Sequence, residues 1–310
     1  MIEVQSLSRF YGSHRAVDNV SFSIAENTVV GVLGLNGAGK TTTLKVIAGL
    51  LQPSSGTVKI DGVDLTEAPV SFRQRISFLP ETPPLYTEMT VTSYLRYLGE
   101  LRGMARRDLD GRLPEVIARC QLAGQTHRVI EELSHGYRKR VGIAQAIIHR
   151  PRVVILDEPI SGLDPVQIVE MRKVIRSLGD EATVLVSSHI LPEVSETCHR
   201  ILVLRKGRLI ADGTEEQLSE RFQGGSVIRI TVAGESEKVV RTLQGVASVK
   251  SVTAQGGRPD RPVFLVEMTG DHRENVVAAL VSAGLGLRRL DDMGGELEDI
   301  FMGLNQEGAA

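Results

Sequence analysis

One stretch of the sequence decides the fold: residues 34–41 read GLNGAGKT, which matches the pattern G-x-x-x-x-G-K-[ST]. An apolar run at 29–33 precedes this stretch and a helical pattern at 41–51 follows it, which is the strand-loop-helix context that the pattern requires. Glycines let successive backbone N–H groups face phosphate oxygens, and the following helix adds the positive end of its dipole. The stretch therefore predicts a phosphate-binding loop. A plain glycine turn is the alternative, which the complete pattern disfavours.

Four polar side chains extend this predicted site. We expect Lys40 to reach the β- and γ-phosphates and the Thr41 hydroxyl to ligate Mg²⁺. Asp157 and Glu158 follow the apolar run 153–156, at the edge where ligands of open α/β sheets bind. Asp157 is suited to hold the Mg²⁺ shell, and Glu158 to polarise the attacking water as general base. A solvated turn is the alternative for these two carboxylates, and the glycine loop favours the functional interpretation.

The composition is that of an ordinary globular protein. The 310 residues are 42% hydrophobic and 24% charged, which disfavours disorder and a coiled-coil rod. The 36 basic and 38 acidic residues give a formal charge of -2, so no basic field favours nonspecific nucleic-acid binding. Cys120 and Cys198 lack CxxC spacing, which argues against a zinc ribbon or a disulfide framework. No run approaches the ~18 apolar residues of a transmembrane helix and no secretory signal is visible, so we expect a cytoplasmic location.

The sequence predicts two domains. Short β-rich runs fill residues 1–65, a helical middle follows at 92–122, and strands alternate with helices between 152 and 204, as in a wound α/β sheet. The linker-like QGGS at 223–226 precedes a second order of strand, helix, two strands, helix and strand. We expect a first domain at 1–221 and a small α+β ferredoxin-like domain at 226–310.

Further motifs resemble the nucleotide-binding subunit of ATP-binding-cassette (ABC) transporters, with matches from residue 11 to residue 189. LSHGY at 133–137 is a variant of that family's LSGGQ signature, SGLD at 161–164 matches its D-loop, and SSH at 187–189 matches its switch-histidine segment. The resemblance implies an α/β P-loop NTPase cassette, with a RecA-like core, an antiparallel β subdomain and a helical subdomain at 82–150. It also implies ATP and Mg²⁺ as the bound groups and ATP hydrolysis as the activity.

The resemblance assigns residues to the bound ATP. Tyr11 would stack on adenine, with Phe10 as the competing choice and a buried strand aromatic as the alternative. His189 would touch the γ-phosphate and the attacking water, so that Lys40, Glu158 and His189 form the catalytic set. The loop residues expected to contact the nucleotide are Gly34, Asn36, Gly37, Ala38, Gly39, Lys40, Thr41 and Thr42.

A second copy of the chain would complete each site. Ser134 and Gly136 begin a helix whose N–H groups and hydroxyl would face a γ-phosphate held by the opposite subunit, and Asp164 would contact that subunit. The resemblance therefore implies a head-to-tail homodimer that sandwiches two ATP molecules.

The chain departs from the family pattern at a few positions. Glu81 stands where glutamine is usual; its carboxylate can accept from Mg²⁺-bound water, but it lacks the amide donor and adds negative charge near the triphosphate. We place Glu81 with Thr41 and Asp157 among the expected metal contacts. His135 replaces a glycine and Tyr137 a glutamine in the signature, and a backbone N–H survives both changes.

The leading interpretation is an ATPase subunit that powers transport through a separate membrane permease, at the inner face of the cell membrane. In this family, the subdomain that includes residues 81–102 grips a coupling helix of the permease. The aromatic helix within 81–102 could equally be part of an ordinary core. LPE at 79–81, LSHGY, and LEDIF at 297–301 resemble cassettes of ABC-2 bacterial exporters. The alternative is a soluble ABC ATPase acting on ribosomes or nucleic acid; such proteins usually carry two cassettes, coiled coils or zinc-binding cysteines. We expect no nucleic-acid partner.

Overall fold

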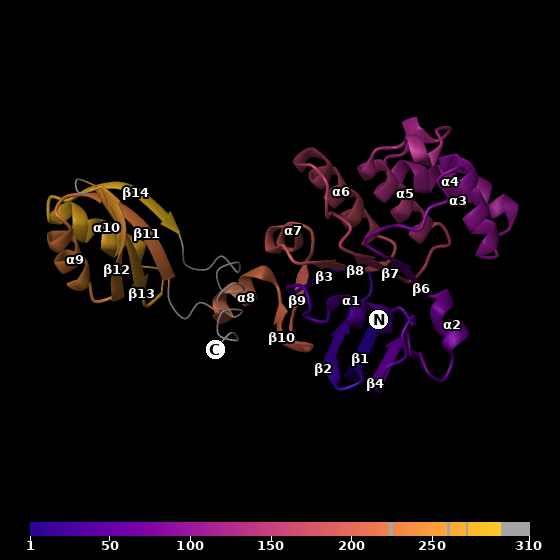
Figure 1. Cartoon of the computed structure of the whole chain (residues 1–310), viewed down its shortest axis with the longest axis horizontal. Helices are drawn as coiled ribbons and strands as arrows, with labels where there is room; N and C mark the ends of the chain where they lie inside the picture. The colour runs from indigo at the N-terminus through magenta and orange to yellow at the C-terminus, as the bar shows by residue number, and fades with distance from the viewer. Residues whose placement is uncertain (223–225, 259–260, 271, 293–310) are drawn as a thin grey trace. The chain divides into compact units, whose positions relative to one another are not determined.

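The computed structural model describes residues 1–222, 226–258, 261–270 and 272–292 (Figure 1). The chain divides into two compact units, Met1–Thr214 and Glu215–Ala310. The domain boundary expected at residue 221 falls inside helix α8 (Glu215–Phe222), which belongs to the second unit. Residues 297–301, which contribute to the ABC-2 resemblance, lie outside the described residues.

The first unit begins with a four-stranded antiparallel sheet in the order β2-β1-β4-β5. Its strands are β1 (Ile2–Tyr11), β2 (His14–Ile24), β4 (Ser55–Ile60) and β5 (Val63–Asp64). Asp61 and Gly62 join β4 to β5 with φ angles of 50° and 75°, the left-handed pair that a tight hairpin turn requires. β1 ends at Tyr11, which places that aromatic ring at the end of the sheet.

A six-stranded sheet forms the centre of the first unit, in the order β10-β9-β3-β8-β7-β6. Its strands are β3 (Val29–Leu33), β6 (Ile76–Leu79), β7 (Val153–Asp157), β8 (Thr183–Ser188), β9 (Arg200–Arg205) and β10 (Arg208–Gly213). Neighbouring strands are parallel except for β10, and β3, β7 and β8 are buried at every position, as their apolar runs predict. The carboxyl ends of β3, β6, β7 and β8 therefore meet at one edge.

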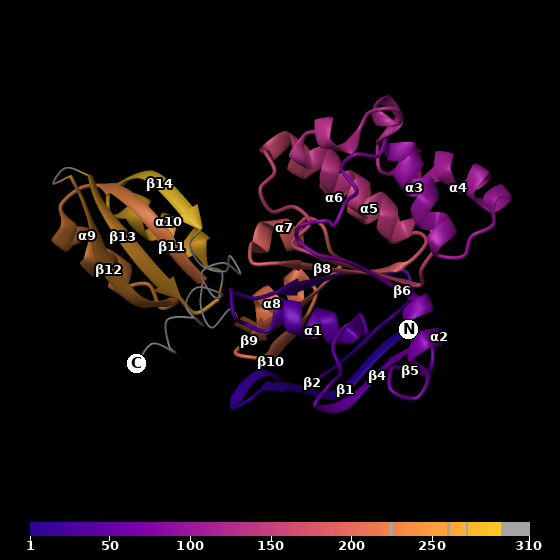
Figure 2. The same cartoon turned by 45° about the vertical axis from the view of Figure 1, so that its right-hand side comes forward.

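Helices cover the central sheet. α1 (Lys40–Ile47) follows β3; the others in this unit are α2 (Pro69–Gln74), α3 (Val91–Leu101), α4 (Arg106–Arg119), α5 (His135–Ile147), α6 (Pro165–Leu178) and α7 (Leu191–Ser195), with short 3-10 turns at Ala123–Gln125 and Ile130–Glu132. In Figures 1 and 2, α3, α4 and α5 lie together on one side of the central sheet and the β1-β2-β4 sheet on the other. α3 carries apolar residues at helical spacing, but this stripe is only partly buried: Tyr94 and Leu95 are in the core, whereas Tyr97 and Leu101 are exposed.

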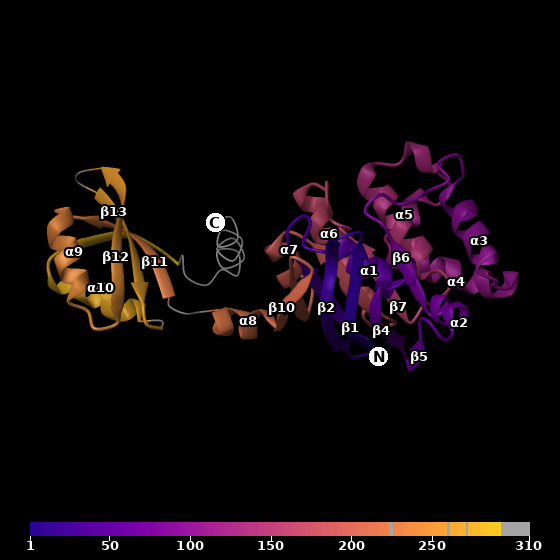
Figure 3. The same cartoon turned by 60° about the horizontal axis from the view of Figure 1, so that its bottom comes forward.

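The second unit contains, after α8, the elements β11 (Ser226–Ala233), α9 (Ser236–Gln244), β12 (Val249–Arg258), β13 (Arg261–Met268), α10 (Arg273–Ser282) and β14 (Gly286–Asp292) (Figure 3). Its sheet has the order β12-β13-β11-β14 with antiparallel neighbours. Alternate residues of β11 and β13, including Ile228, Ile230, Phe264 and Val266, pack with the two helices into a separate core. Across the described ranges of both units, every helix is too short or too polar to cross a bilayer.

Candidate functional site

The glycine loop between β3 and α1 is closely surrounded by backbone. Gly39 has a φ of 100°, and a Cβ there would lie 2.5 Å from the carbonyl oxygen of Ala16. A Cβ on Gly34 would lie 2.7 Å from the carbonyl oxygen of Leu204. Only glycine fits both positions without moving main-chain atoms, because neither obstacle is a flexible side chain. The sequence pattern thus corresponds to a steric requirement.

A cleft of about 330 Å³ opens beside this loop. The predicted residues that line it are Tyr11, Asn36, Gly37, Gly39, Lys40, Thr41, Thr42, Glu81 and Glu158. His14, Ala16 and Leu35 also line it, and the sequence did not single them out. Gly34 and Ala38 are outside the lining, although the Gly34 carbonyl receives a hydrogen bond from the Lys40 side chain. The cleft has the position expected for a phosphate-bearing ligand.

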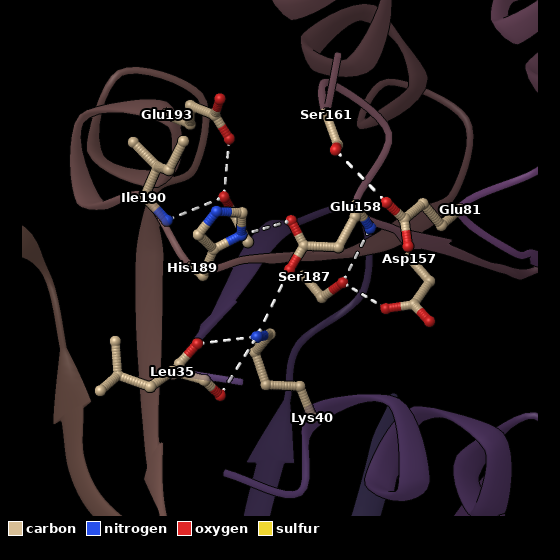
Figure 4. Close-up of polar contacts among 12 residues, drawn as sticks. Leu35, Lys40, Glu81, Asp157, Glu158, Ser161, Ser187, His189, Ile190 and Glu193 are labelled. Carbon is tan, nitrogen blue, oxygen red and sulfur yellow. Dashed lines mark hydrogen bonds and ion pairs between the residues drawn. The ribbon is translucent and has the colours of Figure 1, made fainter. Parts of the chain in front are cut away.

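Lys40 is buried at the base of the cleft. Its Nζ donates a hydrogen bond to the Gly34 carbonyl at 2.7 Å and lies 3.3 Å from Oε1 of Glu158 (Figure 4). A buried ammonium is stable only with such partners, because desolvation is otherwise costly. The ammonium group is therefore held beside the glycine loop, where its charge can interact with phosphate oxygens.

Asp157 is held by two hydroxyl groups. Ser187 Oγ donates to Asp157 Oδ1 at 2.6 Å, and Thr41 Oγ1 donates to the same oxygen at 3.3 Å. Asp157 and Ser187 face each other in the parallel pairing of β7 and β8. Ser187 is fully buried and was not among the residues expected in the site. Its position near the end of the apolar strand β8, within the SSH segment at 187–189, was the available signal, and only the strand register assigns it to Asp157.

The residues expected to hold Mg²⁺ fit that ion. A hydroxyl and a carboxylate oxygen, those of Thr41 and Asp157, lie together, and Mg²⁺ prefers such oxygen ligands. Glu81 lies at the cleft, where its Oε1 accepts a hydrogen bond from Ser161 Oγ at 3.3 Å. The described ranges contain no cluster of three or more His, Cys, Asp or Glu residues suited to a metal. This donor set matches an ion that takes one or two carboxylates and completes its shell with water and phosphate.

Glu158 connects Lys40 to His189. Its Oε2 lies 3.1 Å from Nδ1 of His189, and its backbone N–H donates to Ser187 Oγ at 2.9 Å (Figure 4). The turn that carries His189 is fixed by Ser188, whose hydroxyl donates to Glu193 at 2.6 Å and accepts from the Ile190 N–H at 3.1 Å. The three predicted catalytic side chains thus form one contiguous group. We call Lys40, Thr41, Asp157, Glu158, Ser187 and His189 the nucleotide cluster.

The two adjacent aromatic residues of β1 have different surroundings. Tyr11 is 46% exposed and lines the cleft, with the Arg9 guanidinium 5.0 Å from its ring centre. Phe10 is 37% exposed, does not line the cleft, and lies against Arg15. Neither ring is a buried core residue. The position of Tyr11 is the one that allows a planar contact with a base.

The signature and D-loop residues are not part of this cleft. Ser134 caps the start of α5, where its Oγ accepts from the Tyr137 N–H at 3.4 Å, and Asp164 caps α6 by accepting from the Gln167 N–H at 2.9 Å. A Cβ on Gly136 would lie 2.6 Å from Gln167 Oε1, so the starts of the two helices are closely packed. Ser134, Gly136 and Asp164 are therefore brought together, apart from the cleft lining.

Comparisons with known proteins agree with this geometry. Residues 17–161 match the family model described as ABC transporter. The uncharacterized ABC transporter ATP-binding protein YxlF of Bacillus subtilis strain 168 is 33% identical over 303 residues, which cover 97% of this chain and 98% of the relative. The linearmycin resistance ATP-binding protein LnrL of the same organism is 29% identical over 309 residues, with 98% of both chains covered.

A solved structure of the ATP-binding subunit of an ABC transporter is also similar. It is 32% identical in sequence with a TM-score of 0.64, and the match covers 72% of this chain and 93% of that one. The long match to YxlF extends over both units of the present chain. Since ABC transporter ATP-binding domains are ATPases, the chain is an ATPase and belongs to the ATP-binding subunits of ABC transporters.

Proposed function

We propose that this ATPase hydrolyses ATP in the cleft beside the glycine loop, with Glu158 as the general base. The observation that carries the proposal is the contiguity of the Glu158 carboxylate with Lys40 Nζ at 3.3 Å and His189 Nδ1 at 3.1 Å. Lys40 would stabilise charge on the phosphates, His189 would orient the attacking water, and Tyr11 would stack on adenine. Thr41 and Asp157, with Glu81 beside them, would hold Mg²⁺, which supplies charge neutralisation to the triphosphate when bound.

We further propose that each site is completed by a second copy of the chain. ABC ATPases generally dimerise, and this chain carries a phosphate loop and, apart from it, a variant of the family signature. Its signature residues, Ser134 and Gly136, begin α5 and do not line the cleft of their own chain. A head-to-tail arrangement would place them, with Asp164, against the nucleotide of the partner.

The proposed membrane partner is a separate permease, which exports a substrate. A second cavity of about 350 Å³ lies where β6 leads into the segment before α3, among residues of the helical subdomain. Tyr86 lines this cavity, and the ring centre of Tyr97 lies 5.8 Å from that of Tyr86; both side chains are exposed. Aromatic side chains beside a cavity can anchor a helix of a partner. Pro84, Leu85 and Tyr86 line the cavity and follow Glu81 closely in the chain, so a coupling helix bound there would connect the permease to the nucleotide cleft.

The exporter assignment and the ABC-2 type draw support from the relatives. LnrL, which is similar along nearly the whole chain, is named as a linearmycin resistance protein. Export of a toxic compound is one way to confer resistance, and it would place this subunit at the inner face of the cell membrane through its permease. Affinity capture from detergent-solubilised membranes is expected to recover a polytopic membrane protein. Recovery of ribosomes or nucleic acid alone would contradict the permease assignment.

For the second unit we propose a ferredoxin-like fold, as an accessory domain distinct from the cassette. The element order β11-α9-β12-β13-α10-β14 and the sheet order β12-β13-β11-β14 support it, because this interleaving is that of the split βαβ motif.

The substitution Glu158→Gln tests the catalytic assignment. It removes the base while keeping the size of the side chain, so we expect kcat for ATP hydrolysis to fall by roughly 10²–10⁴-fold. ATP affinity should be preserved, and ATP should trap a stable dimer that size-exclusion chromatography detects. A variant that hydrolyses ATP at the wild-type rate would refute the role of Glu158.

A further inference from the structure

One buried cation lies beside the site and is not used by the proposed mechanism. Lys139, on the second turn of α5, is only 3% exposed. Its Nζ donates a hydrogen bond to the backbone carbonyl oxygen of Glu158 at 3.0 Å. Burying an ammonium group is costly unless it is paired, so its place next to Glu158 calls for a reason beyond packing.

Three carboxylates attract this ammonium group. Burial lowers the pKa of Lys139, and the negative charges of Glu81, Glu158 and Glu193 oppose that lowering. Glu81 follows β6, Glu158 follows β7, and Glu193 lies on α7 after β8. These strands are neighbours in the central sheet, so one cation on α5 serves carboxylates that follow three adjacent strands.

The backbone of Glu158 needs this support. Its φ of 48° lies in the left-handed region, where a residue with a Cβ is strained. A strained backbone conformation of this kind persists only when contacts with neighbouring groups hold it in place. Ser187 Oγ accepts from the N–H of Glu158, and Lys139 donates to its carbonyl. The residue is thus held on both sides of its Cα, and in this conformation its carboxylate faces Lys40 and His189.

We propose that Lys139 is a positioning residue for ATP hydrolysis: it fixes the left-handed backbone of Glu158 and thereby aims the carboxylate at the attacking water. The inference rests on the proposed role of Glu158 as general base. In this proposal α5 carries both Ser134, which faces the partner's nucleotide, and Lys139, which holds Glu158. Lys139 lies five residues after Ser134 on the same helix, about 7.5 Å along its axis. A shift of α5 when Ser134 meets the partner's nucleotide would therefore move the group that holds Glu158.

The test compares Lys139→Met with Arg112→Met. Arg112 is an equally buried cation, 3% exposed, but it pairs with Glu115 and Glu181, away from the cleft lining. We expect Lys139→Met to lower kcat at least tenfold, while KM and the dissociation constant for ATP change less than threefold. Arg112→Met should lower the melting temperature and leave kcat within twofold of wild type, measured below the melting range of both variants.

The proposal is overturned if Lys139→Met keeps kcat within twofold, if its kcat falls only together with ATP affinity, or if Arg112→Met loses the same activity. Should Lys139→Met not fold, Lys139→Arg and Lys139→Gln decide: Arg keeps the cation and its N–H donors, so its kcat must exceed that of Gln, and equal loss overturns the proposal. Glu158→Gln is measured in parallel. A fully active Glu158→Gln contradicts the general-base assignment, whereas an inactive Glu158→Gln beside a fully active Lys139→Met contradicts only the role of Lys139.

Discussion

The nucleotide cluster and the signature residues are built in different ways. In the cluster, side chains from distant parts of the chain bind one another: Thr41 and Asp157 are 116 residues apart. At the signature, the Ser134 and Asp164 side chains bind backbone N–H groups only three residues farther along. The cluster is therefore assembled by the fold, whereas the signature is a pair of helix starts presented outward. This difference supports the proposed composite site, in which one chain supplies a complete phosphate loop and, separately, a surface for the phosphate bound by its partner.

The largest expected effect comes from mixing two damaged chains. Lys40→Met and Ser134→Arg should each lower turnover by about 10²–10³-fold, because each removes a group that stabilises phosphate charge. In a mixed dimer, one of the two sites has an intact Lys40 and an intact Ser134. A one-to-one mixture should therefore regain about a quarter of the wild-type ATPase rate, if dimers form at random and the sites act independently.

A matched mixture provides the control. Lys40→Met and Glu158→Gln both damage the cleft side, so neither site of a mixed dimer is whole and no activity should return. Recovery in this control, or none in the first mixture, would contradict the composite site. The phosphate release rate of each mixture, measured against total protein concentration, distinguishes these outcomes.

A smaller effect is expected from Ser187→Ala, which tests whether the cluster depends on its buried hydroxyl. The change leaves Asp157 with the Thr41 hydroxyl and removes the acceptor of the Glu158 N–H. An unsatisfied buried group costs about 1–3 kcal/mol, so we expect kcat to fall roughly tenfold. Ser177→Ala is the control, because that hydroxyl donates to the Val174 carbonyl within α6. Equal kcat values for the two variants would show that the nucleotide cluster does not depend on the Ser187 hydroxyl.

The smallest expected effect concerns His149, which follows the C-terminal end of α5. It is an effect on the stability of the fold and not on ATP hydrolysis. His149 follows α5, and neither ring nitrogen has a hydrogen-bond partner among the described residues. Burial, aided by the charges of Arg102 and Arg112, lowers its pKa from 6.5 to about 4. The unfolded chain therefore binds a proton below pH 6.5 that the native chain does not, and stability falls as pH falls from 6.5 towards 4.

Between pH 7 and 5.5 this contribution amounts to roughly 1 kcal/mol. Urea unfolding at both pH values should show a smaller acid loss for His149→Gln than for wild type. The exposed His127 gives the control, since His127→Gln should keep the wild-type difference. An unchanged acid loss in His149→Gln would show that this histidine does not set the pH dependence.

The sequence predicted the cassette fold and the identity of most cleft residues because their pattern is local. A phosphate loop needs its glycines and lysine at fixed spacing, so eight consecutive residues suffice to identify it. Asp157 and Glu158 were predictable for a similar reason, since they directly follow an apolar strand. In the structure these residues lie beside the phosphate loop, as expected.

Other features depend on tertiary contacts and could not be predicted from the sequence. Lys139 sits in the basic run 138–140, which is typical of an exposed helix face, yet it is buried against Glu158. Ser187 gains its role only from the pairing of β7 with β8. Tyr97 and Leu101 continued the apolar pattern of α3, but the helix turns them to the surface. Periodicity describes one face of a helix and does not reveal how much of that face another element covers.

The parallel register of β7 and β8 has an evolutionary consequence. Asp157 faces Ser187 and Leu156 faces Val186, so the hydroxyl reaches the carboxylate only at this alignment. Side chains alternate between the faces of a strand, so the loss of a single residue from β8 would turn Ser187 to the opposite face of the sheet. It would also draw His189 away from its contact with Glu158. Insertions and deletions in this lineage should therefore accumulate in surface turns and avoid β8, even though any apolar residue of suitable size could serve at most of its positions.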